Sequence, residues 1–224
     1  MKNINIAIDG PAGAGKSTIA KMVSAKLGYI YVDTGAMYRT CGLAAIKKNI
    51  PCKDEEKVKE LMETMNLNIE FIDGKQHMIL DGEDVTEFIR TPEVSVAASD
   101  ISSLPIVRTK MVDMQRDISK AQTFVLDGRD IGSNVLPNAK YKFFVTASSA
   151  KRAERRLAEL NARGDYSQNF EEVLRDIEYR DKQDSSRANA PLVQVEDAIL
   201  ISTDDIGIED TLNTLLSYID KEDC

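Results

Sequence analysis

One glycine-rich segment constrains the fold of this chain of 224 residues more than any other feature. Its residues, Gly10-Pro11-Ala12-Gly13-Ala14-Gly15-Lys16-Ser17, match the pattern of a glycine, four residues and then Gly-Lys-Ser. Residues 4–8 before it are apolar and β-branched, which predicts a buried strand. After it, Ile19, Val23 and Leu27 recur at every fourth position, which predicts a helix. A strand, a glycine-rich turn and a helix in this order are typical of a phosphate-binding loop.

The residue types in this loop suit a nucleoside triphosphate. Backbone N–H groups of the turn and the positive end of the helix would face phosphate oxygens. Lys16 would reach the β- and γ-phosphates, and the Ser17 hydroxyl would be a ligand of Mg²⁺, the expected cofactor. The expected triphosphate site consists of Gly10, Pro11, Ala12, Gly13, Ala14, Gly15, Lys16, Ser17 and Thr18.

Four further segments read as buried strands, each followed by a turn and a helical stretch. They are residues 29–32, 123–126, 142–145 and 198–201. Strands that alternate with helices imply right-handed crossovers and a parallel sheet. We therefore expect a doubly wound α/β domain with a parallel five-stranded sheet.

The middle of the chain interrupts this alternation. Residues 68–72 and 76–80 flank Asp73-Gly74, which predicts a hairpin, and Asp81-Gly82 predicts a further turn into a short strand near 84–85. Thr91 and Pro92 are suited to the start of a returning helix. We expect a core domain of residues 1–59, 101–149 and 166–224, an inserted small α+β domain of residues 60–100, and a short helical lid of residues 150–165.

The net charge of −8 argues against a general nucleic-acid binder. Residues 196–224 carry nine acids and one base, so the rest of the chain is neutral. We expect these acids to face solvent while four apolar residues of the last helix point inward: Ile208, Leu212, Leu215 and Ile219.

Cysteine use and the absence of long apolar runs favour a cytoplasmic protein. Cys41, Cys52 and Cys224 are odd in number and lack metal-ligand spacing, which is typical of reduced thiols. No signal-peptide segment and no apolar run of membrane-spanning length occurs. The single histidine, His77, lies in the predicted hairpin, so a zinc site or a histidine-based triad is not expected. We expect a monomer that binds small-molecule nucleotides, without membrane or nucleic-acid partners.

Among phosphate-binding-loop proteins, a small kinase suits the sequence best. A GTPase needs a guanine-reading Asn-Lys-x-Asp segment, and the chain has no Asn-Lys dipeptide. A mechanical ATPase would need partner domains for which there is little length. A kinase needs arginines beside the γ-phosphate, and Arg39 and Arg129 follow predicted strands whose ends should meet at the loop. Surface arginines in turns are the alternative.

Two predicted helices carry further arginines. Arg152, Arg155 and Arg156 could form a lid that closes over the phosphoryl group, or a solvated cationic face. Arg180 and Arg187, with Asp184 between them, could bind substrate, or could be an ion-paired helix edge.

Together these segments resemble the bacterial-type cytidylate kinases, nucleoside monophosphate kinases that are similar to adenylate kinase in their core. The resemblance rests on the loop above and on three further motifs: Asp33-Thr34-Gly35-Ala36-Met37-Tyr38-Arg39, Asp127-Gly128-Arg129-Asp130 and Arg187-Ala188-Asn189-Ala190-Pro191-Leu192. It implies transfer of the ATP γ-phosphoryl group to CMP or dCMP, an inserted monophosphate-binding domain and a short lid.

By this resemblance the acceptor site maps onto Thr34, Arg39, Ser99, Arg108, Arg129, Asp130, Arg180, Asp184 and Arg187. Asp130, Ser99 and Arg108 offer the groups that cytosine requires. Asp184 and Arg187 would hold the ribose, which leaves Arg39, Arg129 and Arg180 for the phosphate. The resemblance implies Lys16, Arg129 and Arg180 as catalytic residues. Thr34 stands where serine is frequent, and Gln183 stands where some members carry a basic residue.

Several alternatives stay open at this point. Asp33 and Asp127 could orient water around Mg²⁺ or could cap turns. The chain could act on another nucleotide or on a metabolite such as shikimate, or it could be a regulatory protein that hydrolyses nucleotide slowly. The sequence does not decide between CMP and dCMP, nor which lid arginine contacts ATP.

Overall fold

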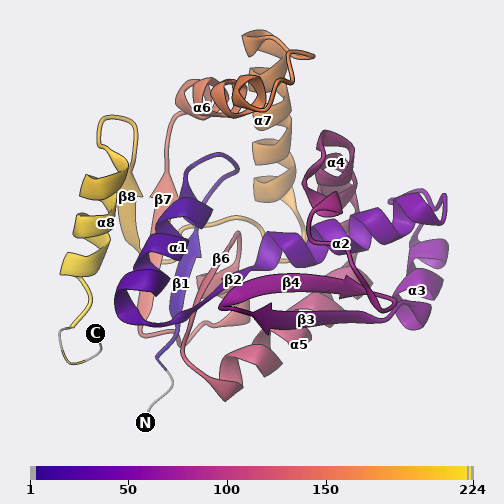
Figure 1. Ribbon diagram of the computed structural model, residues 1–224, viewed down its shortest axis with the longest axis horizontal. Helices are drawn as coiled ribbons and strands as arrows, with labels where there is room; N and C mark the ends of the chain where they lie inside the picture. Colours follow the sequence, from indigo (N-terminus) through magenta and orange to yellow (C-terminus); the bar gives the residue numbers. More distant parts are fainter. Residues whose placement is uncertain (1–3, 221, 223–224) are drawn as a thin grey trace.

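The computed structural model describes residues 4–220 and 222. Its central layer is a parallel five-stranded sheet in the order β2-β6-β1-β7-β8 (Figure 1). The strands are β1 (Ile6–Asp9), β2 (Ile30–Asp33), β6 (Phe124–Gly128), β7 (Tyr141–Thr146) and β8 (Ile199–Ser202). The chain leaves the central strand β1 toward both edges of the sheet, which confirms the predicted doubly wound α/β fold.

The helices lie between the strands as the apolar spacing predicts. They are α1 (Lys16–Leu27), α2 (Thr34–Lys47), α3 (Glu55–Thr64), α4 (Pro92–Ile101), α5 (Pro105–Ala121), α6 (Ser149–Ala162), α7 (Phe170–Ser186) and α8 (Ile208–Ser217). A 3₁₀ helix, η1 (Phe88–Arg90), and a π-helical turn, η2 (Ile131–Val135), complete the description. The predicted start of α4 is confirmed, because the Thr91 side chain accepts a hydrogen bond from the backbone N–H of Val94 and Pro92 is the first helical residue.

The interruption between α3 and α4 is a separate antiparallel sheet. It consists of β3 (Leu67–Ile72), β4 (Lys75–Leu80) and β5 (Glu83–Asp84). At the first turn Asp73 and Gly74 both have positive φ, 51° and 73°, as a two-residue type I′ turn requires. The second Asp-Gly pair makes the same kind of turn, so both predicted turns are confirmed.

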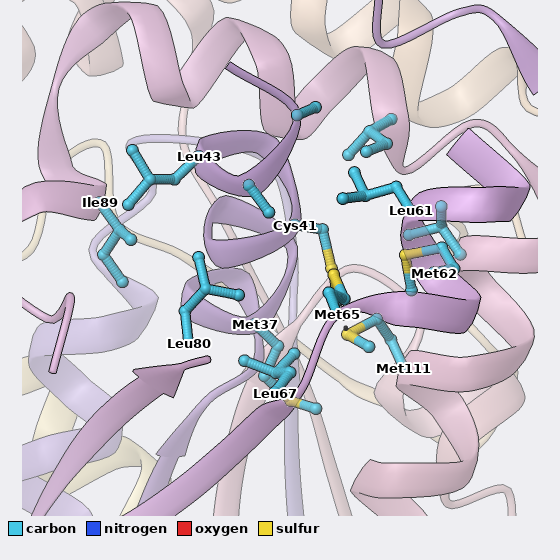
Figure 2. Close-up of a cluster of buried hydrophobic side chains, with 14 of the residues drawn as sticks. Met37, Cys41, Leu43, Leu61, Met62, Met65, Leu67, Leu80, Ile89 and Met111 are labelled. Carbon is cyan, nitrogen blue, oxygen red and sulfur yellow. Dashed lines mark hydrogen bonds between the residues drawn. The ribbon is translucent and has the colours of Figure 1, made fainter. Parts of the chain in front are cut away.

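The inserted segment shares a hydrophobic core with helices of the main domain. Figure 2 shows side chains of α2, α3, β3, β4 and α5 packed together, with sulfur atoms at its centre. Met37, Cys41 and Met111 are fully buried there, beside Met62 and Met65. The insert is therefore anchored on α2 and α5. The division into three parts, with boundaries at 60–100 and 150–165, stays a prediction.

The C-terminal helix α8 follows the expected pattern except at its first residue. Leu212, Leu215 and Ile219 are buried against the main sheet, and most of the acids described after Glu196 are exposed. The prediction for Ile208 is wrong, because its side chain is 47% exposed. Ile208 is the first residue of α8 and lines a cavity, whereas Leu212, one turn later, packs with residues of the sheet. Lys221, Asp223 and Cys224 lie outside the described residues.

Two other sequence features can be placed. His77 lies in β4, as expected, and pairs with Asp84 on the neighbouring strand at 2.7 Å. Within the described part of the chain, no helix combines the length and apolar character needed to cross a bilayer.

Candidate active site

A cavity of about 760 Å³ lies at the carboxyl ends of the parallel strands. The loop between β1 and α1 forms one side of it, and the turns after β2 and β6 form its floor. Helices α6 and α7 border it from the other side. Most of the expected donor residues and all of the expected acceptor residues therefore face one space.

The phosphate-binding loop depends on glycine at its first position. A Cβ added at Gly10 would lie 1.9 Å from the carbonyl oxygen of Val145 on β7, and the residue has a φ of 145°. Gly10 and Pro11 are buried and do not line the cavity, whereas residues 12–18 do. Gly10 thus allows the loop to pass close to the neighbouring strand.

Lys16 begins α1 and is folded back across the loop. Its ammonium donates a hydrogen bond of 2.7 Å to the carbonyl oxygen of Pro11. Burial, followed by the nearby Arg129 guanidinium, lowers the pKa of Lys16 to about 7. The residue is only 5% exposed, so an anion that enters the cavity would raise the pKa of Lys16 and favour its charged form.

The Asp127 carboxylate at the end of β6 connects the loop to β2. Its two oxygens accept hydrogen bonds from the Ser17 hydroxyl at 2.9 Å and the Tyr31 hydroxyl at 2.7 Å. The Thr34 hydroxyl donates to the Asp127 carbonyl oxygen at 2.7 Å. Burial and the neighbouring Asp33 raise the pKa of Asp127.

The donor set beside the loop suits Mg²⁺. A hydroxyl at Ser17 and a carboxylate at Asp127 are hard oxygen donors, and they touch one another. In the described residues no group of three or more His, Cys, Asp or Glu side chains is placed to bind a metal. Because Mg²⁺ in nucleotide sites takes most of its ligands from phosphate and water, a sparse protein set of this kind fits it.

Asp33 holds two arginines at the end of β2. Its carboxylate caps α2 through the backbone N–H of Ala36, and it pairs with Arg39 at 2.7 Å and Arg90 at 3.2 Å. Burial alone would raise its pKa, but the two guanidinium groups together with the backbone N–H of Ala36 lower it. Gln76 of β4 bonds both the backbone N–H and the carbonyl oxygen of Asp33, which ties the insert to the cavity floor.

Arg108 of α5 and Asp130 after β6 form a buried ion pair. The Asn134 amide donates to the same Asp130 oxygen at 3.0 Å, and the Arg108 guanidinium lies 5.5 Å from the centre of the Tyr38 ring. Both members of the pair line the cavity, as does Ser99 of α4. All three residues expected to read a base therefore line the same cavity.

A second cluster of charges lies on α7. Asp184 accepts a hydrogen bond from Arg129 at 2.7 Å and lies 3.2 Å from Arg187. Arg180, one turn earlier, makes no ion pair or hydrogen bond with any residue that the structure describes. Burial and then the charges of Arg129 and Arg156 lower its pKa. The cavity therefore presents a cation without a direct anionic partner.

The three arginines expected in the lid lie on α6 but differ in position. Arg155 and Arg156 line the cavity, and Arg155 donates to the hydroxyl and carbonyl oxygens of Thr203 at 2.9 and 2.5 Å. Arg152 does not line the cavity and is almost fully buried behind the loop. The helix is therefore not a simple solvated cationic face.

Sequence reasoning missed several residues of the site, among them Arg90, Tyr31 and Tyr38. Arg90 reaches Asp33 across 57 positions of the chain, and no local pattern marks it. Tyr31 and Tyr38 read as ordinary strand and helix residues. Their hydroxyl and ring contacts depend on β6 and α5, which are distant in sequence.

Comparison with known proteins gives the family. Residues 6–221 match the family model described as cytidylate kinase. The chain belongs to the cytidylate kinase family. Curated cytidylate kinases from Caldicellulosiruptor bescii and Bacillus cytotoxicus are 49% and 45% identical to it. The first alignment covers 99% of this chain and 97% of the relative, and the second covers 98% and 97%. As a member of the cytidylate kinase family, the chain is an enzyme of the nucleoside monophosphate kinase class.

Solved structures support the fold. A gluconokinase from Sinorhizobium meliloti superposes with a TM-score of 0.51 at 10% identity, covering 96% of this chain and 90% of that one. An uncharacterized protein from Eubacterium ventriosum gives a TM-score of 0.55 at 10% identity, covering 97% and 99%. At such low identity, these two structures support only the α/β fold of this chain.

Proposed function

We propose that this member of the family transfers the γ-phosphoryl group of ATP to CMP or dCMP and releases CDP or dCDP. The observation that carries the proposal is one cavity that joins the phosphate-binding loop to the buried Arg108–Asp130 pair. Arg180, which has no ion-pair partner among the described residues, also lines it. The cavity thus offers binding groups for both a nucleoside triphosphate and a nucleoside monophosphate.

Cytosine fits the Arg108–Asp130 end of the cavity. Its exocyclic amine is a donor that a carboxylate or hydroxyl accepts, and its ring N3 and O2 are acceptors that a guanidinium serves. Asp130 and Ser99 offer acceptors, and Arg108 has a buried Nε without a hydrogen-bond partner among the described atoms. Uracil presents the reverse pattern at two of these positions, so it would leave buried groups unpaired.

The acceptor phosphate would bind to arginines that internal carboxylates already orient. Arg39 and Arg129 are held by Asp33 and Asp184, which keeps both guanidinium groups in place at the cavity wall. Arg180 completes the set as a cation that has no direct partner in the described part of the chain. We infer that these three arginines bind the phosphate, while Asp184 and Arg187 face the ribose.

The chemistry needs no general base. The attacking phosphate oxygen is already anionic, so catalysis rests on in-line positioning and on neutralising charge that spreads over the transferred group. Lys16 and the arginines supply that neutralisation, with Arg155 and Arg156 on the donor side. When bound, Mg²⁺ would be held by Ser17, with Asp127 nearby, and would neutralise phosphate charge.

We further propose a monomer that works in the cytoplasm on small-molecule nucleotides of pyrimidine metabolism and does not bind nucleic acid. The excess of exposed acid near the C-terminus supports this, since it would repel a polyanion.

An acceptor panel tests the proposal. ATP turnover is measured with purified protein and CMP, dCMP, UMP, AMP, GMP or shikimate. We expect CMP or dCMP to exceed the others by about tenfold or more in kcat/KM. Preferred turnover of AMP or shikimate would replace the proposal with a related kinase activity, and turnover that no acceptor stimulates would indicate a regulatory protein.

A further inference from the structure

Arg152 of α6 connects three segments that are distant in sequence. Its Nε donates to the carbonyl oxygen of Ala147 at 2.8 Å, and its Nη1 donates to the carbonyl oxygen of Ala12 in the phosphate-binding loop at 3.0 Å. Both terminal nitrogens fork onto the Asp181 carboxylate of α7, at 3.0 and 2.5 Å. One guanidinium therefore joins the end of β7, the loop and α7.

Helix α6 also packs directly on the loop. A Cβ added at Gly13 would lie 3.2 Å from the Cβ of Arg152, so the loop passes close to the stem of this side chain. In Figure 1, α6 lies above the loop that precedes α1. The Arg152 side chain is only 5% exposed, and a buried guanidinium held by a forked carboxylate has little freedom to move.

Asp181 extends this connection toward the acceptor end of the cavity. It directly follows Arg180 on α7 and lies less than one turn before Asp184. Asp184 in turn holds Arg129 at 2.7 Å. A continuous series of contacts thus runs from Ala12 through Arg152, Asp181 and α7 to the proposed phosphate ligands.

We propose that Arg152 and Asp181 are positioning residues that couple the triphosphate loop to the acceptor arginines, so that binding at either end strengthens binding at the other. This inference rests on the proposed function for the nature of the acceptor. Neither side chain lines the cavity, so both act through the loop and α7. Coupling of this kind is reciprocal and depends on both partners of the pair.

The test uses the full chain with Arg152→Lys, Asp181→Asn and the double substitution. Calorimetry measures the affinity for a non-hydrolysable ATP analogue with Mg²⁺, alone and with a saturating acceptor. The acceptor is the monophosphate that the unaltered enzyme phosphorylates best. We expect it to strengthen analogue binding about fivefold or more in the unaltered enzyme. In each single variant this factor should fall to about one, and the double variant should be no worse than either single one.

Glu178→Gln is the matched control. Glu178 also lies on α7 and faces α6, but it accepts only a long contact of 3.5 Å from Ser149 at an exposed position. Its coupling factor should match that of the unaltered enzyme. If Asp181→Asn fails to fold in thermal melting, Asp181→Glu takes its place, and only partial coupling is then expected because the longer side chain displaces the fork.

Two results would overturn the inference. One is coupling that persists at full strength in the Asp181 variant. The other is weaker analogue binding in Arg152→Lys alone, with normal behaviour of Asp181→Asn, which would make Arg152 a direct ligand of the triphosphate. If no monophosphate is phosphorylated, the proposed function fails separately. The affinity for the ATP analogue alone then tests whether Arg152 and Asp181 position the loop. If they do, both variants should bind the analogue about fivefold more weakly, and an unchanged affinity would contradict the inference.

Discussion

Arg108 and Asp130 pair with their side chains only 2% and 5% exposed, although each comes from a different element and both face the cavity. Taking two charges out of water costs free energy that the pair only partly recovers. Under the proposed function, a pair in this position would serve recognition of the base more than stability. Its charges remain available to a base that inserts beside them.

Removing one partner should reveal this cost. Among the described residues, Arg108→Met leaves only the Asn134 amide as a donor to the buried Asp130 carboxylate, so we expect the free energy of unfolding to fall by about 3–5 kcal/mol. Urea unfolding followed by circular dichroism measures the change. The double variant Arg108→Met with Asp130→Leu should recover much of the loss, because no charge is then buried alone. Equal stability of the single variant and the unaltered protein would contradict the buried pair.

The loop geometry predicts a strong effect at Gly10 and a weak one at Gly164. Gly10→Ala would place a methyl group 1.9 Å from the Val145 carbonyl oxygen, so we expect loss of ATP binding together with a lower melting temperature. Gly164 also has a positive φ, 76°, but nothing lies within 4 Å of an added Cβ. Gly164→Ala should cost about 1 kcal/mol from backbone strain alone and leave ATP affinity unchanged. Similar melting curves for the two variants would refute this difference.

Lys16 should carry a large share of turnover. Lys16→Ala removes the charge that neutralises the transferred phosphoryl group, and we expect kcat to fall by about 10²-fold or more. Steady-state assays at saturating ATP and CMP measure the loss. Lys21→Ala is the control, because Lys21 borders the cavity from α1 but contacts the Tyr31 ring and not the loop carbonyl. Normal turnover by Lys16→Ala would remove this lysine from the mechanism.

The lowered pKa of Lys16 predicts proton uptake on nucleotide binding. At pH 8 the free enzyme holds this amine mostly neutral, since its pKa is about 7, and bound phosphates would draw a proton onto it. Calorimetric titration of the ATP analogue in buffers of different ionisation heat measures the uptake. We expect more uptake at pH 8 than at pH 6, and the excess should vanish in Lys16→Met. Equal uptake at both pH values would contradict a neutral Lys16.

The lowered pKa of Lys16 also determines how its contribution to the free energy of unfolding changes with pH. Between pH 7 and 10.5 the unfolded chain keeps the Lys16 proton that the folded protein has lost. The unfolded state then binds more protons, so the contribution of Lys16 to folding stability rises with pH across this window. In urea unfolding at pH 7 and pH 9, Lys16→Met should therefore lose part of the increase shown by the unaltered protein.

Local patterns in the sequence predicted most of the fold. The five buried strands and both Asp-Gly turns depend on residues within a few positions of one another, and each is found as predicted. The phosphate-binding loop could also be predicted from local sequence, since its glycines, Lys16 and Ser17 directly follow a strand. Ile208 was misplaced because helical periodicity gives a face and does not say where the helix first meets the sheet.

Side-chain partners across long distances were not predictable in the same way. In the sequence, Arg152 is one of several basic residues on an amphipathic helix, yet two of its hydrogen-bond partners lie 140 and 29 positions away. Arg90 gives no local signal at all, because its approach to Asp33 depends on how the insert packs on α2. The sequence shows the chemical type of each side chain, whereas the orientation of the side chain and its partners depend on tertiary packing.

The ratio of kcat/KM for CMP to that for UMP tests the central claim most directly, in the unaltered enzyme and in Asp130→Asn. If Asp130 and Arg108 read cytosine, the unaltered enzyme should favour CMP by about tenfold or more, and the variant should lose most of this preference while its KM for ATP stays within about twofold. A ratio near one in the unaltered enzyme, or a preference that survives Asp130→Asn, would contradict the reading of cytosine at this pair.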